Sequence, residues 1–84
     1  MKTVEFKVAG HVNYDAKMAG KIVTALSDVS SNVFIISANA RVNAKSIMGM
    51  MTLGLSPGEE VTVTADGADE KEAIQSIEQY LSAK

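Results

Sequence analysis

The sequence contains no cysteine, no tryptophan and only one histidine, His11. Without cysteine, disulfides and cysteine-ligated zinc or iron–sulfur centres are excluded. A single histidine cannot build a histidine-rich metal centre, and the six glycines form no nucleotide-binding motif. The sequence therefore predicts a protein without a metal, a cofactor or the catalytic centre of an enzyme.

An excess of positive charge is also lacking. Eight Lys and Arg residues against ten Asp and Glu residues give a net charge of −2, so the basic surface typical of nucleic-acid binders is not expected. No apolar run approaches the ~18 residues that a membrane-spanning helix needs, and residues 1–7 alternate where a signal peptide would be continuously apolar. We expect a soluble, cytoplasmic protein that contacts neither nucleic acid nor membrane.

What the sequence does contain is enough apolar residues for one small core. With 84 residues, of which 46% are hydrophobic, residues 1–84 are predicted to form a single domain. Period-two alternation or dense runs of β-forming residues predict four strands, at Thr3–Val8, Val33–Ile36, Arg41–Ala44 and Glu60–Asp66. The turn between the second and third of these strands is expected at Asn39-Ala40.

Three helices are predicted between and after the strands. A helical apolar stripe follows Asp15 at Ala19, Ile22, Val23 and Leu26, and another follows Asp69 at Ile74, Ile77 and Leu81. Asp15 and Ser46 are expected to cap their helices, and Asp69 with Glu72 has the spacing of a capping box. The order βαββαβα predicts an α/β (α+β) two-layer sandwich, with a four-stranded, mainly antiparallel sheet covered on one face by three helices.

Acidic and histidine residues offer few candidates for chemistry. The carboxylate pairs Glu59-Glu60 and Asp69-Glu70 are expected to be helix caps and solvated surface. His11 and Asp15 could form an acid–base pair, but no nucleophile accompanies them. An exposed, inert loop histidine is therefore the favoured interpretation of His11.

Ser46 stands just ahead of a short apolar helix and is a candidate modification site. A helix cap alone would explain a serine at this position. A phosphate on the same hydroxyl would meet the positive end of the helix and place up to about two negative charges beside Ile47, Met48 and Met51. Both interpretations, a cap and a switch for a partner, stay open from the residues alone.

Residues 42–49 (VNAKSIMG), continued by Met51, Leu53 and Gly54, closely resemble the regulatory-serine segment of the HPr family, the histidine-containing phosphocarriers of the bacterial sugar phosphotransferase system. The segment Gly67–Glu70 with Ala73 is similar to the last turn and helix of the same family. The resemblance extends over essentially the whole chain and implies an HPr-like βαββαβα fold.

The sequence departs from the HPr family at the start of the first helix. The family pattern His-Ala-Arg-Pro-Ala is here Asp15-Ala16-Lys17-Met18-Ala19, so an aspartate replaces the phosphoryl-accepting histidine. Lys17 keeps the charge of the arginine but lacks its planar fork, and Met18 lacks the rigidity of proline. A carboxylate could form only an acyl phosphate, so the phosphohistidine relay is expected to be lost. Asp15 either only caps the helix or imitates a phosphorylated histidine by its fixed charge.

A kept serine segment with a lost histidine resembles the catabolite repression HPr-like branch of the family. The resemblance implies that an HPr kinase/phosphorylase phosphorylates Ser46 with ATP, and that the product binds a LacI-type catabolite control repressor as corepressor. Ile47, Met48, Met51 and Lys17 would form or flank the contact surface. For Met50, a place in the core and a place in the contact surface are equally open.

Two other functions remain as alternatives. The first is a phosphocarrier of the phosphoenolpyruvate-dependent sugar phosphotransferase system, with the enzymes of that system as partners. The second is an HPr-fold binding module that is phosphorylated at neither position. Asp15 favours the regulatory protein switched at Ser46 over the phosphocarrier.

Overall fold

The computed structural model describes residues 1–38 and 40–82, and it contains all seven predicted elements in the predicted order. They are β1 (Lys2–Lys7), α1 (Ala16–Ala25), β2 (Asn32–Ile36), β3 (Arg41–Asn43), α2 (Ile47–Leu53), β4 (Glu60–Asp66) and α3 (Glu70–Leu81). The predicted turn includes Asn39, which lies outside the described residues. Four strand boundaries move by one residue: β1 starts at Lys2 and ends at Lys7, β2 starts at Asn32, and β3 ends at Asn43.

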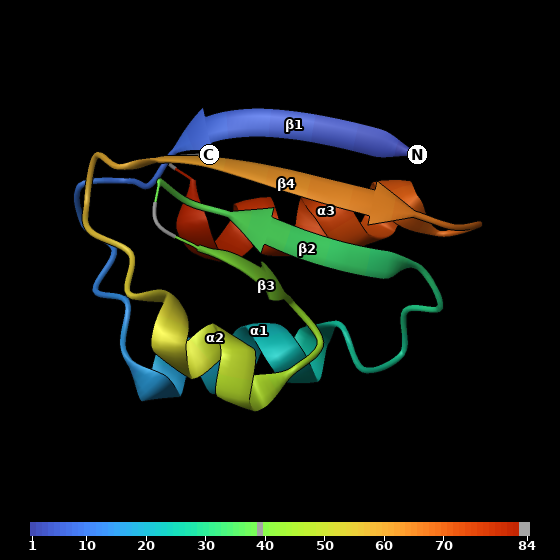
Figure 1. The fold of residues 1–84 in the computed structure, drawn as a ribbon, viewed down its shortest axis with the longest axis horizontal. Helices are drawn as coiled ribbons and strands as arrows, with labels where there is room; N and C mark the ends of the chain where they lie inside the picture. The colour runs from blue at the N-terminus through green and yellow to red at the C-terminus, as the bar shows by residue number, and fades with distance from the viewer. Residues whose placement is uncertain (39, 83–84) are drawn as a thin grey trace.

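The four strands form one antiparallel sheet in the order β1-β4-β2-β3 (Figure 1). Successive strand residues point to opposite faces of a sheet, so one register decides which residues are buried. Val33 and Ile35 of β2 and Val61, Val63 and Ala65 of β4 are all buried on the same side. This apolar face requires a cover of helices.

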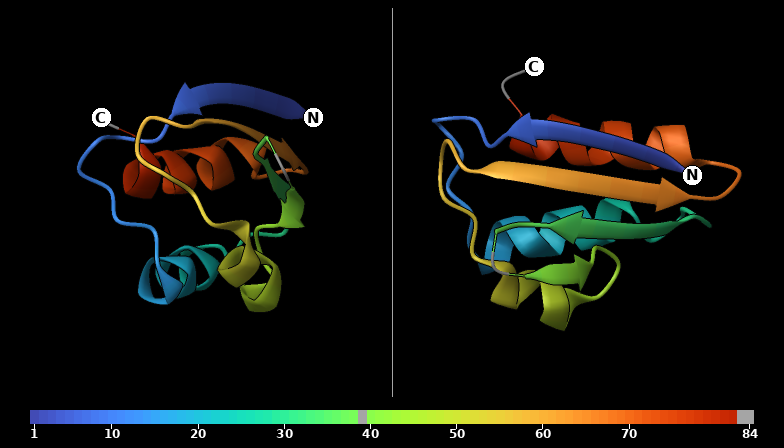
Figure 2. Two further views of the ribbon diagram at one scale, coloured as in Figure 1. Left: turned by 60° about the vertical axis from the view of Figure 1, so that its left-hand side comes forward. Right: turned by 45° about the horizontal axis from the view of Figure 1, so that its top comes forward.

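All three helices lie on that one face of the sheet (Figure 2). The predicted stripes are confirmed, because α1 buries Ala19 and Ile22 with Leu26 at its end, and α3 buries Ile74, Ile77 and Leu81; Val23 is half-buried. Within the described residues, no helix is long and apolar enough to cross a membrane. The α/β two-layer sandwich predicted from the order of the elements is thus the observed fold.

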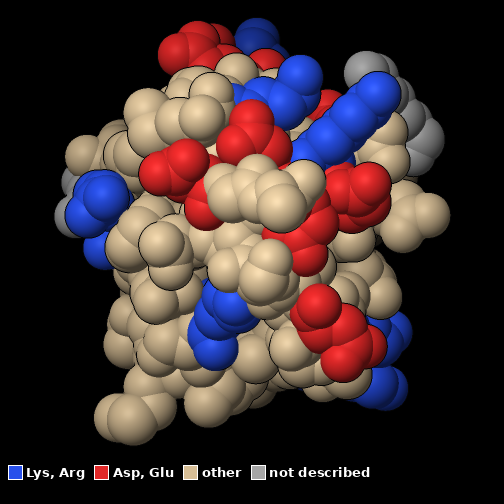
Figure 3. Space-filling view, turned by 90° about the vertical axis from the view of Figure 1, so that its right-hand side faces the viewer, with Lys and Arg blue, Asp and Glu red and all other residues tan. Residues whose placement is uncertain are grey.

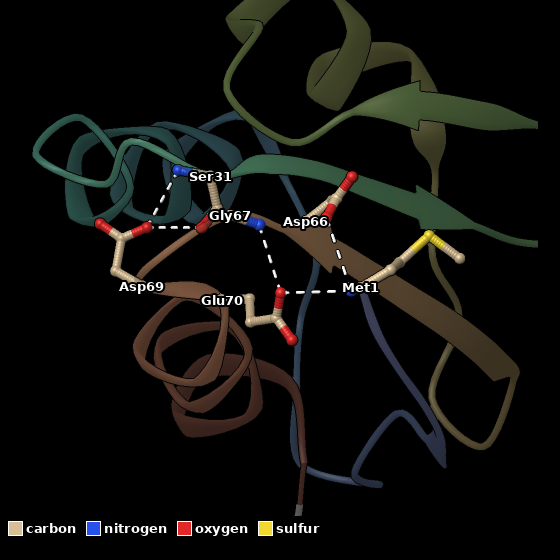
Figure 4. Close-up of polar contacts among 6 residues, drawn as sticks. All are labelled: Met1, Ser31, Asp66, Gly67, Asp69 and Glu70. Carbon is tan, nitrogen blue, oxygen red and sulfur yellow. Dashed lines mark hydrogen bonds and ion pairs between the residues drawn. The ribbon is translucent and has the colours of Figure 1, made fainter.

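The start of α3 differs from the prediction. Asp69 occupies the N-cap position, but its side chain makes no capping hydrogen bond, so the capping box with Glu72 is wrong. Instead, the Asp69 carboxylate accepts hydrogen bonds from the backbone N–H groups of Ser30 (2.9 Å) and Ser31 (3.0 Å). The hydroxyls of both serines also donate to it, Ser31 at 2.5 Å and Ser30 at 3.3 Å. Asp69 therefore fastens the loop before β2 to the turn after β4 (Figure 4).

Gly67 allows this loop and turn to approach each other. A Cβ atom at Gly67 would lie 2.5 Å from the Ser31 hydroxyl oxygen and 2.7 Å from the Ser31 Cα atom, which is closer than side chains pack. The N–H group of Gly67 donates to the Glu70 carboxylate at 3.2 Å. Glu70 and Asp66 also lie within 3.5 Å of the Met1 amino group (Figure 4).

Carboxylates gather on the side of the molecule where β4 ends and α3 begins (Figure 3). Glu70 and Glu72 lie in the first turn of α3, where negative charge stabilises the helix by offsetting its positive end. At the other predicted pair, the Glu59 carboxylate accepts a hydrogen bond from the Ser56 N–H group at 3.0 Å, and Glu60 is exposed. Glu60 is therefore solvated surface as expected, whereas Asp69 bonds the loop before β2 instead of capping α3.

The Asp69 contacts predict acid sensitivity. The hydrogen bond from the Ser31 side chain, followed by that from the Ser30 backbone, lowers the pKa of Asp69 from 3.8 to about 2. Because the folded-state pKa lies below the unfolded-state value, this stabilisation is complete above pH 4 and is lost as the pH falls towards about 2. Urea unfolding from pH 7 to pH 2 should show a steep loss of stability in this window. Asp69→Asn should be less stable at pH 7 and show a flatter profile.

Asp28→Asn is the matched control for this prediction. It removes an exposed carboxylate that makes no hydrogen bond or ion pair with the other described residues. The pH profile of this variant should follow the wild type. An Asp69→Asn profile as steep as the wild-type profile between pH 4 and pH 2 would contradict the role assigned to Asp69.

Candidate functional site

Asp15 caps α1 as predicted. Its carboxylate accepts a hydrogen bond from the Met18 N–H group at 2.9 Å, and its carbonyl accepts one from the Ala19 N–H group at 2.9 Å. The first turn of a helix has N–H groups without a partner inside the helix, and a short carboxylate at the cap satisfies one of them. The position where the sequence predicts a lost histidine is thus filled by a structural acceptor.

A shallow pocket of about 410 Å³ surrounds the start of α1. It combines the preceding loop with one side of α1 and with the end of α3. The lining residues are His11, Val12, Asn13, Asp15, Lys17, Met18, Lys21, Gln79 and Tyr80. The fold therefore brings His11 to the same pocket as Asp15 and Lys17, although His11 itself is an exposed loop residue, as predicted.

Ser46 caps α2 as predicted. Its hydroxyl oxygen accepts a hydrogen bond from the Gly49 N–H group at 3.3 Å, and its carbonyl accepts one from the Met50 N–H group at 2.9 Å. At the other end of the helix, Gly54 adopts a left-handed conformation with a φ of 57°, which favours glycine. Local residues therefore fix both ends of α2, Ser46 at the start and Gly54 at the end.

The apolar residues of α2 divide into a buried and an exposed set. Met50 is fully buried and Leu53 nearly so, which assigns Met50 to the core. In contrast, Ile47 is 42%, Met48 78% and Met51 55% exposed. We call these three side chains the α2 patch. Contiguous exposed apolar side chains next to a polar group are typical of a surface that binds a partner.

Lys45 holds the chain just before Ser46. Its ammonium group donates to the carbonyl oxygens of Val29, at 2.5 Å, and Ser31, at 3.3 Å. These carbonyls belong to the loop that Asp69 fastens from the other side. The start of α2 is therefore anchored to the same loop as the start of α3, a role that the sequence did not indicate.

Tyr14 is the second residue that sequence reasoning missed. Its hydroxyl donates to the Met50 carbonyl at 2.5 Å, although the two residues are 36 positions apart. Burial raises the pKa of Tyr14 to about 12, so the hydroxyl keeps its proton at neutral pH and can donate. The hydrogen bond joins the loop before α1 to α2.

The predicted site residues fall into two groups. Asp15 and Lys17 lie at the start of α1, whereas Ser46 caps α2 and the α2 patch lies on that helix. The helices run side by side in opposite directions, so that the start of α1 is next to the end of α2 and not to its start (Figure 1). Within the described residues, no hydrogen bond or ion pair joins Lys17 to Ser46.

A family model described as "PTS HPr component phosphorylation site" matches residues 2–83. The chain belongs to the HPr family. This confirms the resemblance inferred from residues 42–49.

Individual relatives include both HPr and HPr-like proteins. HPr-like protein Crh of Bacillus subtilis (strain 168) is 42% identical over 66 residues, which are 79% of this chain and 78% of Crh. The crystal structure of HPr-C-His from Thermoanaerobacter tengcongensis matches with a TM-score of 0.85 at 37% identity, covering 99% of this chain and 93% of that one. A crystal structure of B. subtilis Crh, described as an intertwined dimer with domain swapping, matches with a TM-score of 0.72 at 39% identity, covering 92% and 84% of the two chains. This HPr family member is thus related to Crh and to HPr phosphocarriers.

The cap at Asp15 predicts a measurable contribution to stability. Replacing an aspartate N-cap by alanine removes the acceptor of the Met18 N–H group, so Asp15→Ala should destabilise the protein by about 1 kcal/mol in urea unfolding at pH 7. Asp28→Ala, which removes an exposed carboxylate beyond the end of α1, should change the stability much less. Equal losses in the two variants would mean that general charge effects, and not the cap, account for the result.

Proposed function

We propose that this HPr family member is a regulatory protein of carbon catabolite control, switched by phosphorylation of Ser46. In this proposal an HPr kinase/phosphorylase adds phosphate from ATP to the Ser46 hydroxyl. The phosphorylated protein then binds a LacI-type catabolite control repressor as its corepressor. Enzymes of the phosphotransferase system are further candidate partners. The placement of Ser46 next to the α2 patch is the observation that carries this proposal.

The surroundings of Ser46 suit a phosphorylation switch. Negative charge at the start of a helix is favourable because it faces the positive end of the helix dipole. The serine is half-buried, whereas Ile47 and Met48 directly after it are exposed. A phosphate would therefore change the charge beside the patch without forcing α2 to unfold.

The α2 patch suits protein docking. Exposed methionines adapt to different partner surfaces because their side chains are unbranched and flexible. Met48 and Met51 lie one turn apart on α2 and are among the most exposed large apolar side chains of the described residues. A binding surface that combines these side chains with a new phosphate would distinguish the modified from the unmodified protein.

Asp15 weighs against a phosphohistidine carrier. Its carboxylate is engaged by the Met18 N–H group, so it stabilises the helix that the family's histidine would precede. A carboxylate has no neutral nitrogen nucleophile to accept and pass on a phosphoryl group near pH 7. In the regulatory function, the negative charge of Asp15 either only caps α1 or imitates a phosphorylated histidine. Unchanged affinity for the partner in Asp15→Asn would argue for the cap alone.

Labelling with radioactive ATP and purified HPr kinase/phosphorylase tests the switch. The wild type should incorporate one phosphate, and Ser46→Ala should incorporate none, because the accepting hydroxyl is absent. Thr52→Ala is the matched control, since it removes the other hydroxyl of the same helix, which donates to the Gly49 carbonyl at 2.8 Å. Thr52→Ala should be labelled like the wild type. Full labelling of Ser46→Ala would overturn the proposal.

Binding of the labelled protein to the repressor tests the docking surface in the same experiment. Met48→Ala and Met51→Ala should each weaken binding about tenfold, as truncation of a central interface side chain does. Gln75→Ala, on the exposed side of α3, should bind like the wild type.

The phosphocarrier alternative is favoured by one observation, the pocket that gathers His11, Lys17 and Lys21. Incubation with phosphoenolpyruvate and the first enzyme of the phosphotransferase system should leave the wild type unlabelled, because Asp15 replaces the nucleophile. The triple substitution Asp15→His, Lys17→Arg and Met18→Pro restores the family pattern and is the positive control. Labelling of the wild type that disappears in His11→Ala would instead identify His11 as an acceptor.

A further inference from the structure

Tyr14 lies between the start of α1, with Asp15, and α2, with the α2 patch. It directly precedes Asp15, and its side chain packs against the core and is half-buried. Its hydroxyl reaches across to α2 and donates to the carbonyl of Met50 at 2.5 Å. The other tyrosine, Tyr80, lines the pocket at the start of α1, and its hydroxyl makes no hydrogen bond with the described part of the chain.

The contact meets a need of α2. The last four carbonyls of a helix have no N–H partner within it, and Met50 is the first of the last four residues of α2. With seven residues, α2 is far shorter than the ~12 residues at which isolated helices become even marginally stable in water. Its position must therefore be fixed by contacts with the rest of the protein, and Tyr14 supplies a polar one at its C-terminal end.

Met50 also takes part in the hydrogen bonding at the start of α2. Its N–H group donates to the carbonyl of Ser46, whose hydroxyl in turn caps the helix at Gly49. Both backbone groups of Met50 are therefore bonded: its N–H group donates to the Ser46 carbonyl, and its carbonyl accepts from the Tyr14 hydroxyl. Met51, a member of the α2 patch, follows directly.

We infer that Tyr14 is a positioning residue that couples the start of α1 to α2. The Tyr14 hydroxyl connects the two parts. The cap that Asp15 makes next to it should stabilise the packing of α2, and the packing of α2 should stabilise the cap. Loosening the loop before α1 therefore loosens α2 and the patch that it presents, although neither Tyr14 nor Asp15 belongs to that patch. The coupling concerns the folded unmodified protein, so it does not rest on the proposal that Ser46 is phosphorylated.

Native-state hydrogen exchange of the full chain, followed residue by residue by NMR, measures this coupling. In Tyr14→Phe the ring stays and only the donor is lost, so the fold should be kept. The backbone amides of residues 50–53 should exchange about three- to tenfold faster than in the wild type, which corresponds to one neutral hydrogen bond. Tyr80→Phe removes the same atom from a tyrosine whose hydroxyl makes no hydrogen bond within the described residues, and it should leave these amides unchanged.

A double-mutant cycle separates coupling from a general loss of stability. Asp15→Ala should accelerate exchange of the amides of residues 50–53 in the presence of Tyr14. Added to the Tyr14→Phe background, it should accelerate them by at most a minor further factor, because the connection is already broken. The same acceleration by Asp15→Ala in both backgrounds would overturn the coupling. Unchanged α2 exchange in Tyr14→Phe would overturn the role of the hydroxyl itself.

Discussion

Helix α2 carries the serine and the exposed apolar side chains, and it is too short to be stable by itself. The function proposed for the protein therefore depends on contacts that come from outside the helix. Met50 and Leu53 bury its inner side in the core, Gly54 ends it, and Tyr14 satisfies one of its last carbonyls. Because these contacts on the inner side hold the helix, the exposed side does not have to pack against the rest of the protein and can contact a partner.

The loop before β2 supports the same arrangement from the other end. Lys45 binds two carbonyls of this loop, and Asp69 binds two of its N–H groups and two of its hydroxyls. The lysine ammonium group donates to backbone carbonyls, and the aspartate carboxylate accepts from backbone N–H groups. The loop is therefore bound through both kinds of backbone group. Because the starts of α2 and α3 share this loop, the α2 patch keeps a fixed position relative to the sheet.

Much of the fold was predictable from the sequence, because it rests on local patterns. The alternation in Glu60–Asp66 and the stripe of Ile74, Ile77 and Leu81 placed β4 and α3 correctly, since burial of one face imposes a period on the residues. The caps at Asp15 and Ser46 were predictable for a similar reason, since a cap bonds an N–H group three residues ahead. Asp69 was expected to do the same and does not.

The failures have one cause. Asp69 bonds residues 38 and 39 positions away, and Tyr14 bonds one 36 positions away, so no local spacing reveals either partner. A polar residue at a helix start can bond an N–H group of the helix itself or a group far away in the sequence, and the tertiary arrangement decides which partner it takes. Gly67 offered a hint, because a glycine two residues before Asp69 allows the close approach that brings Ser31 within reach.

The two ends of α2 are unequal in a way that suits a switch. At its start, a hydroxyl accepts a single 3.3 Å hydrogen bond, and added negative charge there faces the positive end of the helix. At its end, the carbonyls already carry partial negative charge, and a phosphate there would repel them. A modification at Ser46 therefore adds charge beside the α2 patch while the buried Met50 and its bond to Tyr14 keep the helix in place. A phosphate on Ser46 would change the charge of the surface without a change of fold, because buried Met50 and Leu53 and the bond from Tyr14 hold α2 through contacts that do not use the Ser46 hydroxyl.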